Sequence, residues 1–173
     1  MPFRPLTFAL GTLGLLALQV AVLNQVSLWG LARPFPYPLL ILALPFGFSR
    51  AGSLGLAFAA GLLLDVFSDT PGLHAAALVA MAYGRKPVAG LITPKGGYEA
   101  GDAPHIASLG VVWYVAYAGM LLLLHHAILF GLEAFTLAGL GRTLARVLLS
   151  AALSLATVLL LEFLFGPRTD RRR

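Results

Sequence analysis

The chain has no cysteine and few charged residues. Without cysteine it can form neither a disulfide, a thiolate nucleophile nor a cysteine-based metal site. Only 11% of its 173 residues are charged, whereas soluble domains carry about 25%. Hydrophobic residues make up 59% of the chain, and the mean hydropathy is +0.88. Because so few charges could not cover the surface of a soluble domain, the composition predicts an integral membrane protein.

Motifs of the common catalytic and ligand-binding sites are also missing. The sequence contains no H-E-x-x-H zinc motif, no G-x-S-x-G around a serine and no G-x-x-x-x-G-K-[ST] phosphate loop. His125 and His126 are adjacent, so on a helix their side chains point about 100° apart and do not easily share a metal ion. We therefore expect no catalytic residue, no metal and no cofactor. The net charge of +5 is attributed to membrane topology rather than to nucleic acid.

The apolar residues fall into six segments, and a membrane span needs about 20 residues. They cover residues 6–28, 36–48, 51–67, 73–83, 106–130 and 144–165. Pro38 and Pro45 predict a bent second segment. The fourth segment is short, and it is either re-entrant or continues past Arg85 and Lys86. The sequence predicts an all-α protein, a single transmembrane domain over residues 1–173 that forms a six-helix bundle, with a short basic tail at 168–173.

Positive charge predicts the orientation of these segments. With the N-terminus in the cytoplasm, nine of the twelve Lys and Arg residues lie on the cytoplasmic side, and Arg33, Arg142 and Arg146 lie outside. Cytoplasmic segments carry the excess of Lys and Arg in multi-pass membrane proteins. We therefore expect both termini in the cytoplasm, which agrees with an even number of spans.

Asp65 lies near the end of the third apolar segment, in G-L-L-L-D-V-F-S-D-T-P-G-L-H-A. An acidic side chain costs about 2.5–3.5 kcal/mol at the centre of a bilayer and less toward its surface, so Asp65 requires a partner. The candidates are Arg142, Arg146, His74, or a backbone amide at the turn formed by Pro71 and Gly72. The structural interpretation, in which this cluster fixes helix packing, is favoured over a proton relay. A duplicated half with paired broken helices, which would indicate a transporter, is absent.

Small residues spaced by four mark places where helices can approach closely. The pairs are Ala17 and Ala21, Gly55 and Ala59, Ala57 and Gly61, and Ser150 and Ser154. The two serines continue a stripe that begins with Arg142 and Arg146. We interpret these pairs as helix-packing seams rather than as chemistry.

Taken in order, these features resemble the MreD family of rod shape-determining membrane proteins. The first apolar segment ends in Asn24 and Gln25, and a proline-rich segment, residues 34–38, opens the second. A G-x-x-x-D motif and a Pro-Gly-Leu turn follow, at Gly61, Asp65, Pro71, Gly72 and Leu73. A subset of the family also carries HH-x(6)-E, here His125, His126 and Glu133, and an Arg and Ser in the last helix, here Arg146 and Ser150.

The resemblance implies a non-enzymatic component of the machinery for bacterial cell elongation and peptidoglycan synthesis, located in the cytoplasmic membrane. Its expected partners are an MreC-like membrane-anchored periplasmic protein, the elongation-specific glycosyltransferase and transpeptidase pair and, indirectly, the actin-like MreB filament. The implied fold is similar to the substrate-binding subunit of energy-coupling-factor vitamin transporters, which supplies the alternative function. Structural or interaction roles are expected for Gly61, Asp65, Pro71, Gly72, His74, His126, Glu133, Arg142, Arg146 and Ser150.

Overall fold

The computed structural model describes residues 5–98, 103–136 and 139–167, and within these ranges the chain is helical, with no strand. The predicted all-α class is therefore confirmed. The helices are α1 (Pro5–Ala21), a short 3-10 helix η1 (Leu23–Gln25), α2 (Leu39–Leu42), α3 (Arg50–Ser68), α4 (Leu73–Leu91), α5 (Ile106–Leu109), α6 (Val111–Ala134) and α7 (Leu140–Phe165). The predicted basic tail at 168–173 lies outside the described residues.

Four helical stretches are long and apolar enough to cross a membrane: Phe8–Gln25, α3, α6 and α7. The described residues thus contain four candidate membrane spans, as in a membrane protein, and the predicted six spans are not confirmed. The second predicted span contains only the four-residue helix α2. The fourth continues past Arg85 and Lys86 as one 19-residue helix, which is the second of the two alternatives, but these two charges interrupt its apolar character.

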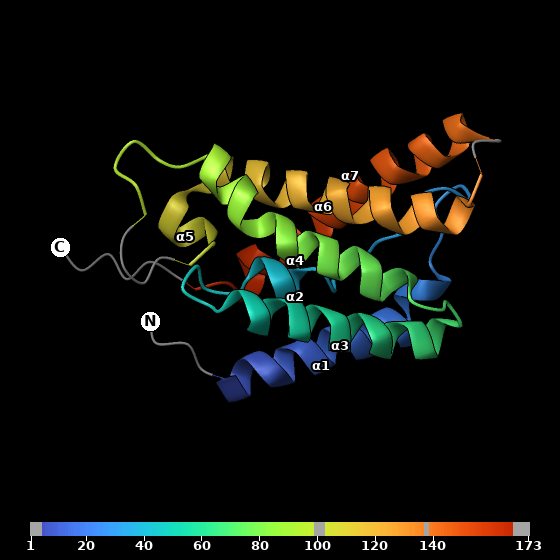
Figure 1. Ribbon diagram of the computed structural model, residues 1–173, viewed down its shortest axis with the longest axis horizontal. Helices are drawn as coiled ribbons and strands as arrows, with labels where there is room; N and C mark the ends of the chain where they lie inside the picture. Colours follow the sequence, from blue (N-terminus) through green and yellow to red (C-terminus); the bar gives the residue numbers. More distant parts are fainter. Residues whose placement is uncertain (1–4, 99–102, 137–138, 168–173) are drawn as a thin grey trace.

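The long helices run along the bundle, α1, α3 and α6 in one direction and α4 and α7 in the other (Figure 1). α1, α3 and α6 begin at one end, drawn at the left, and α4 and α7 end there. The segment between η1 and α3 must therefore return along the length of the bundle, and it does so largely without helix. We refer to the end where α3 begins as the basic end and to the end where α3 meets α4 as the acidic end.

The middle of the returning chain is buried among the helices. All five residues of the proline segment, residues 34–38, are buried. A buried backbone amide must find a hydrogen-bond acceptor, and at membrane depth irregular backbone is tolerated only inside the protein. The three prolines have no amide to satisfy. The N–H of Phe35 donates to Ser154 Oγ at 2.9 Å, and the N–H of Arg33 donates to Ser150 Oγ at 3.1 Å. The two serines, expected to form a helix-packing seam, therefore hold irregular backbone instead.

Several predicted boundaries move. The fifth segment is divided at Gly110, whose φ of +83° favours glycine. α5 precedes that residue and α6 follows it. Glu133 was expected in the loop after the fifth segment. It lies instead in the last turn of α6, because this helix extends to Ala134. α7 begins at Leu140, four residues before the predicted start.

Candidate functional site

Asp65 connects the end of α3 to the start of α4. α3 ends at Asp69 in a left-handed conformation, and Pro71 and Gly72 form the turn. Gly72, with φ of +82°, precedes α4 as its N-cap residue but has no side chain with which to accept from the first amides of the helix. Asp65, only 4% exposed, accepts from them: its Oδ1 from the N–H of His74 at 2.9 Å and its Oδ2 from the N–H of Ala75 at 3.0 Å.

This arrangement identifies the partner of Asp65. Of the four candidates, the backbone amide describes it best, although the amides belong to His74 and Ala75 rather than to the turn itself. The hydroxyl of Thr70 also donates to Oδ1, at 2.8 Å. Neither Arg142 nor Arg146 pairs with Asp65. A carboxylate at a helix N-terminus is also favoured by the helix dipole, so Asp65 is stabilised without a cation.

Gly61 brings the two helices into backbone contact. A Cβ atom added there would lie 2.6 Å from the backbone nitrogen of Ala75, which real Cβ atoms do not approach. The predicted close approach at Gly61 is therefore present, and the helix that uses it is α4 of the same chain. This contact positions Asp65, one turn further along α3, against the start of α4.

A buried cluster of Tyr37, His74 and His125 joins three parts of the bundle. The Tyr37 hydroxyl lies 2.8 Å from His74 Nδ1 and 2.9 Å from His125 Nε2. Tyr37 and His125 are fully buried, and His125 Nδ1 has no hydrogen-bond partner. The tyrosine therefore ties the proline segment to α4 and to α6. Sequence reasoning considered His125 as a metal ligand, in a proton relay and in the HH-x(6)-E pattern. Nothing in the local pattern indicated Tyr37 as its partner.

His126 belongs to a second buried chain of hydrogen bonds. Its Nδ1 lies 2.7 Å from the carbonyl oxygen of Leu122, which can only accept, so Nδ1 carries the proton. Nε2 therefore accepts from the Ser154 hydroxyl at 3.2 Å, and the same oxygen accepts from the N–H of Phe35. The two adjacent histidines thus have different partners: His125 contacts Tyr37 of the proline segment, and His126 contacts Ser154 of α7. Within the described ranges, no group of three or more His, Asp or Glu residues could hold a metal ion.

The predicted outer cations do not join the Asp65 cluster. The Arg146 guanidinium donates to both carboxylate oxygens of Glu133, at 3.0 and 2.9 Å, and lies over the Phe130 ring at 4.4 Å. Both charged side chains are partly exposed, so this pair contributes about 1 kcal/mol or less. Arg142, in the first turn of α7, is exposed. Glu133 and Arg146 therefore connect α6 to α7 and not to α3.

At the basic end, Arg85 is a functional candidate that the sequence reasoning did not identify. It is 7% exposed, its Nε donates to the Tyr117 hydroxyl at 2.9 Å, and its Nη2 donates to the carbonyl oxygen of Leu44. Beside it lies a pocket of about 350 Å³ between α3 and α4, which Arg50 and Lys86 also line. The available signal was the pair of adjacent cations inside an apolar segment, which we used only for orientation.

A second hollow, about 360 Å³ and almost entirely apolar, lies between α1 and α3. We call it the α1–α3 groove. Its lining residues are Leu13, Leu16, Ala17, Val20, Ala21, Leu63, Leu64 and Phe67. Ala17 and Ala21 are exposed along it, which fits their predicted role as a small-residue pair on the surface of the first helix.

Comparison with known proteins does not identify a family for the chain. No family model, no curated protein and no solved structure matches the chain.

Proposed function

We propose that this chain is a membrane scaffold of the MreD type in the bacterial cytoplasmic membrane. It would position an MreC-like single-span protein, and through it the elongation-specific glycosyltransferase and transpeptidase pair and MreB, by helix contacts and without catalytic turnover. The proposal rests on the sequence resemblance together with two features of the bundle.

The first feature is that the buried polar groups at the predicted positions serve the fold. Asp65 accepts from the start of α4, and Ser150 and Ser154 accept from the backbone next to and within the proline segment. His126 uses both ring nitrogens within the chain. Groups engaged in this way rigidify a bundle, as a scaffold requires, and they are not placed to attack a substrate.

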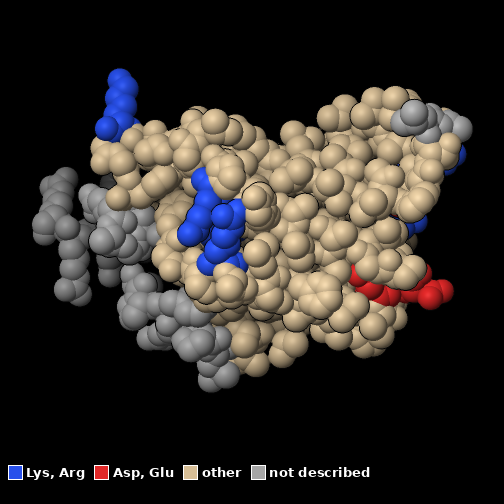
Figure 2. All heavy atoms as spheres, viewed as in Figure 1, with Lys and Arg blue, Asp and Glu red and all other residues tan. Residues whose placement is uncertain are grey.

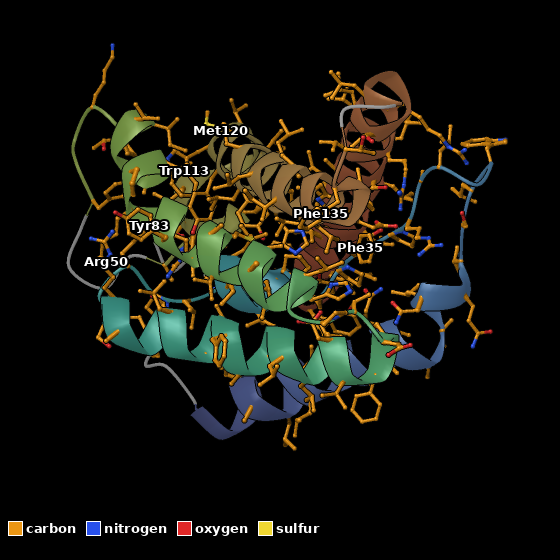
Figure 3. All side chains as sticks on the ribbon, turned by 45° about the vertical axis from the view of Figure 1, so that its right-hand side comes forward. Phe35, Arg50, Tyr83, Trp113, Met120 and Phe135 are labelled. Atoms are coloured by element: carbon orange, nitrogen blue, oxygen red, sulfur yellow. The ribbon has the colours of Figure 1, made fainter. Side chains whose placement is uncertain are left out.

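The α1–α3 groove is the observation that carries the proposal. α1 lies at the edge of the bundle beside α3 (Figures 1 and 3). Within the membrane, helices associate through close packing at small residues rather than through hydrophobicity. Ala17 and Ala21 offer such a surface, with Leu63 and Phe67 as the facing wall. A transmembrane helix of the MreC-like partner would pack there.

The arrangement of the cations supports the proposed orientation. Arg50 begins α3, Arg85 and Lys86 lie in the second half of α4, and Lys95 follows that helix. α1 begins and α7 ends at this same end (Figure 1). Under the positive-inside rule this end faces the cytoplasm, which would place both termini there.

Cysteine cross-linking is a direct test, because the chain has no cysteine of its own. Ala17→Cys or Ala21→Cys, co-expressed with an MreC-like protein that carries single cysteines along its span, should give a disulfide-linked product at one helical face. Ala152→Cys, an exposed alanine on α7, is the matched control and should give none. Equal cross-linking from both sites, or none from α1, would refute the groove as the contact surface.

The alternative is a substrate-binding subunit of an energy-coupling-factor vitamin transporter. One observation favours it: the 350 Å³ pocket at the basic end falls within the volume range of small-molecule sites. In that case the protein purified from native membranes should carry a tightly bound vitamin-like molecule and should be recovered with an ATPase pair. Recovery with a single-span periplasmic protein and wall-synthesis enzymes would reject this alternative.

A further inference from the structure

We propose that the pocket at the basic end binds the phosphate group of an anionic lipid. The pocket opens between the start of α3 and the second half of α4. The inference goes beyond the scaffold role and does not depend on it, because it requires only that the chain is a membrane protein.

The described charged residues that line the pocket are all positive. Arg50, Arg85 and Lys86 line it, and among the residues that the structure describes no acidic side chain does. On the face drawn in Figure 2, a group of Lys and Arg atoms lies toward this end, and the visible Asp and Glu atoms lie toward the opposite end, where some Lys and Arg atoms are also seen. A phosphate would therefore meet three cations from the described part of the chain.

Arg85 provides the strongest argument for an anion. A buried charge is expensive unless an opposite charge accompanies it. The two acceptors of Arg85, the Tyr117 hydroxyl and the carbonyl oxygen of Leu44, are neutral, and no described carboxylate pairs with it. A phosphate in the adjacent pocket would supply the missing negative charge.

The walls of the pocket favour an amphiphilic ligand over a small soluble anion. The Arg50 guanidinium lies over the Tyr83 ring, 4.2 Å from its centroid, so this cation is held across the gap from α3 to α4. Figure 3 shows Arg50 and Tyr83 close together at this end of the bundle. Phe46 and Tyr98, with ring centroids 4.6 Å apart, add apolar surface, which would contact the carbon chains next to a lipid phosphate.

The position in the membrane agrees with this ligand. α3 is a candidate span that begins at Arg50, so its first turn lies where an apolar core meets the headgroups. Basic pockets between transmembrane helices at that depth bind lipid phosphates. Lys86 is exposed and completes the site from the α4 side.

Native mass spectrometry of the full chain in detergent, titrated with phosphatidylglycerol or phosphatidylcholine, tests the proposal. The wild-type chain should retain phosphatidylglycerol in preference to phosphatidylcholine. The double variant Arg50→Gln with Lys86→Gln should bind phosphatidylglycerol about 25-fold more weakly, since each of the two cations near an anionic headgroup contributes roughly a fivefold factor. Lys95→Gln is the matched control, because Lys95 is exposed at the same end but does not line the pocket.

Each result decides a separate point. Selective loss in the double variant, with a thermal unfolding midpoint like that of the wild type, would support the pocket. Equal loss in Lys95→Gln would show general attraction by the basic end and would overturn it. Displacement of the lipid by millimolar inorganic phosphate would reject the lipid as the source of the phosphate. Unchanged binding in the double variant would overturn the site altogether, and it would leave the cross-linking result for the α1–α3 groove unaffected.

Discussion

The two ends of the bundle treat a buried charge in opposite ways. At the acidic end, Asp65 accepts three hydrogen bonds, two from backbone amides of α4 and one from the Thr70 hydroxyl. At the basic end, Arg85 is buried to a similar degree, but it donates to two neutral oxygens and lies beside two further cations. Within the described part of the chain, Asp65 is compensated by hydrogen bonds to its charged oxygens, whereas Arg85 has no negatively charged partner.

The difference indicates which charge belongs to the fold and which to a ligand. The Asp65 carboxylate accepts from the first amides of α4 and so acts as a helix cap. Its removal should therefore lower the stability of the bundle rather than abolish binding of a ligand. The Arg85 guanidinium lies beside two further cations, and its described hydrogen-bond acceptors are neutral, so its charge is available to an anionic ligand. Substitutions at the two ends should therefore differ in what they change.

Asp65→Ala should have the largest effect on stability. It leaves the buried amides of His74 and Ala75 without an acceptor and removes the charge that favours the start of α4, at a cost of about 3 kcal/mol. The free energy of unfolding, measured by SDS titration in mixed micelles, reports this loss directly. If the chain were as stable as the wild type, the capping role of Asp65 would be wrong.

Asp65→Asn is the matched control for that measurement. The amide keeps one oxygen of the right size, so one of the two α4 amides retains its acceptor, and the loss should be about half that of Asp65→Ala. A smaller loss of stability for Asn than for Ala would show that the retained oxygen and the side-chain volume contribute to stability. Equal losses would assign the whole effect to the charge.

Gly61→Ala should have the second-largest effect, because it separates the helices that Asp65 joins. The added Cβ would meet the backbone of Ala75, which cannot move as a side chain can, so a destabilisation of about 2 kcal/mol is expected. Gly55→Ala, in the same helix but with no atom within 4 Å of the added Cβ, should instead stabilise by about 0.5 kcal/mol. Similar values for both in the same SDS titration would contradict the close approach at Gly61.

The sequence predicted the acidic end well because that end is built from local signals. The order Asp65, Pro71, Gly72 and His74 shows where one helix stops and the next begins, and the cost of a membrane acid requires a partner. Even so, Arg142, Arg146 and His74 remained open alternatives to the backbone amide. The observed acceptor geometry results from a glycine N-cap that has no side chain of its own. A missing side chain is a weak signal unless the cap position is already known.

The proline segment and the basic pocket could not be predicted, because they depend on contacts distant in sequence. Phe35 and Ser154 are 119 residues apart, and the segment was expected to form a bent helix because it is apolar. Hydropathy predicts that residues 34–38 are buried. It does not predict whether their backbone amides donate within a helix or to serine side chains of another helix. Arg85 was likewise treated as a topology signal, since no local pattern shows that its neighbours are Tyr117 and Leu44.

Apart from the control variants, Arg85→Met should destabilise the chain less than Asp65→Ala or Gly61→Ala. It also gives the clearest contrast with Asp65→Ala. Met keeps an apolar stem of similar length, and the lost bonds to Tyr117 and Leu44 are offset by removal of a buried charge without a counter-ion. A net loss of about 1 kcal/mol is expected in the SDS titration, and bound phosphatidylglycerol should protect this variant less than the wild type. A loss as large as that of Asp65→Ala, with protection by the lipid unchanged, would mean that Arg85 is a structural group like Asp65. The two ends would then not differ in kind.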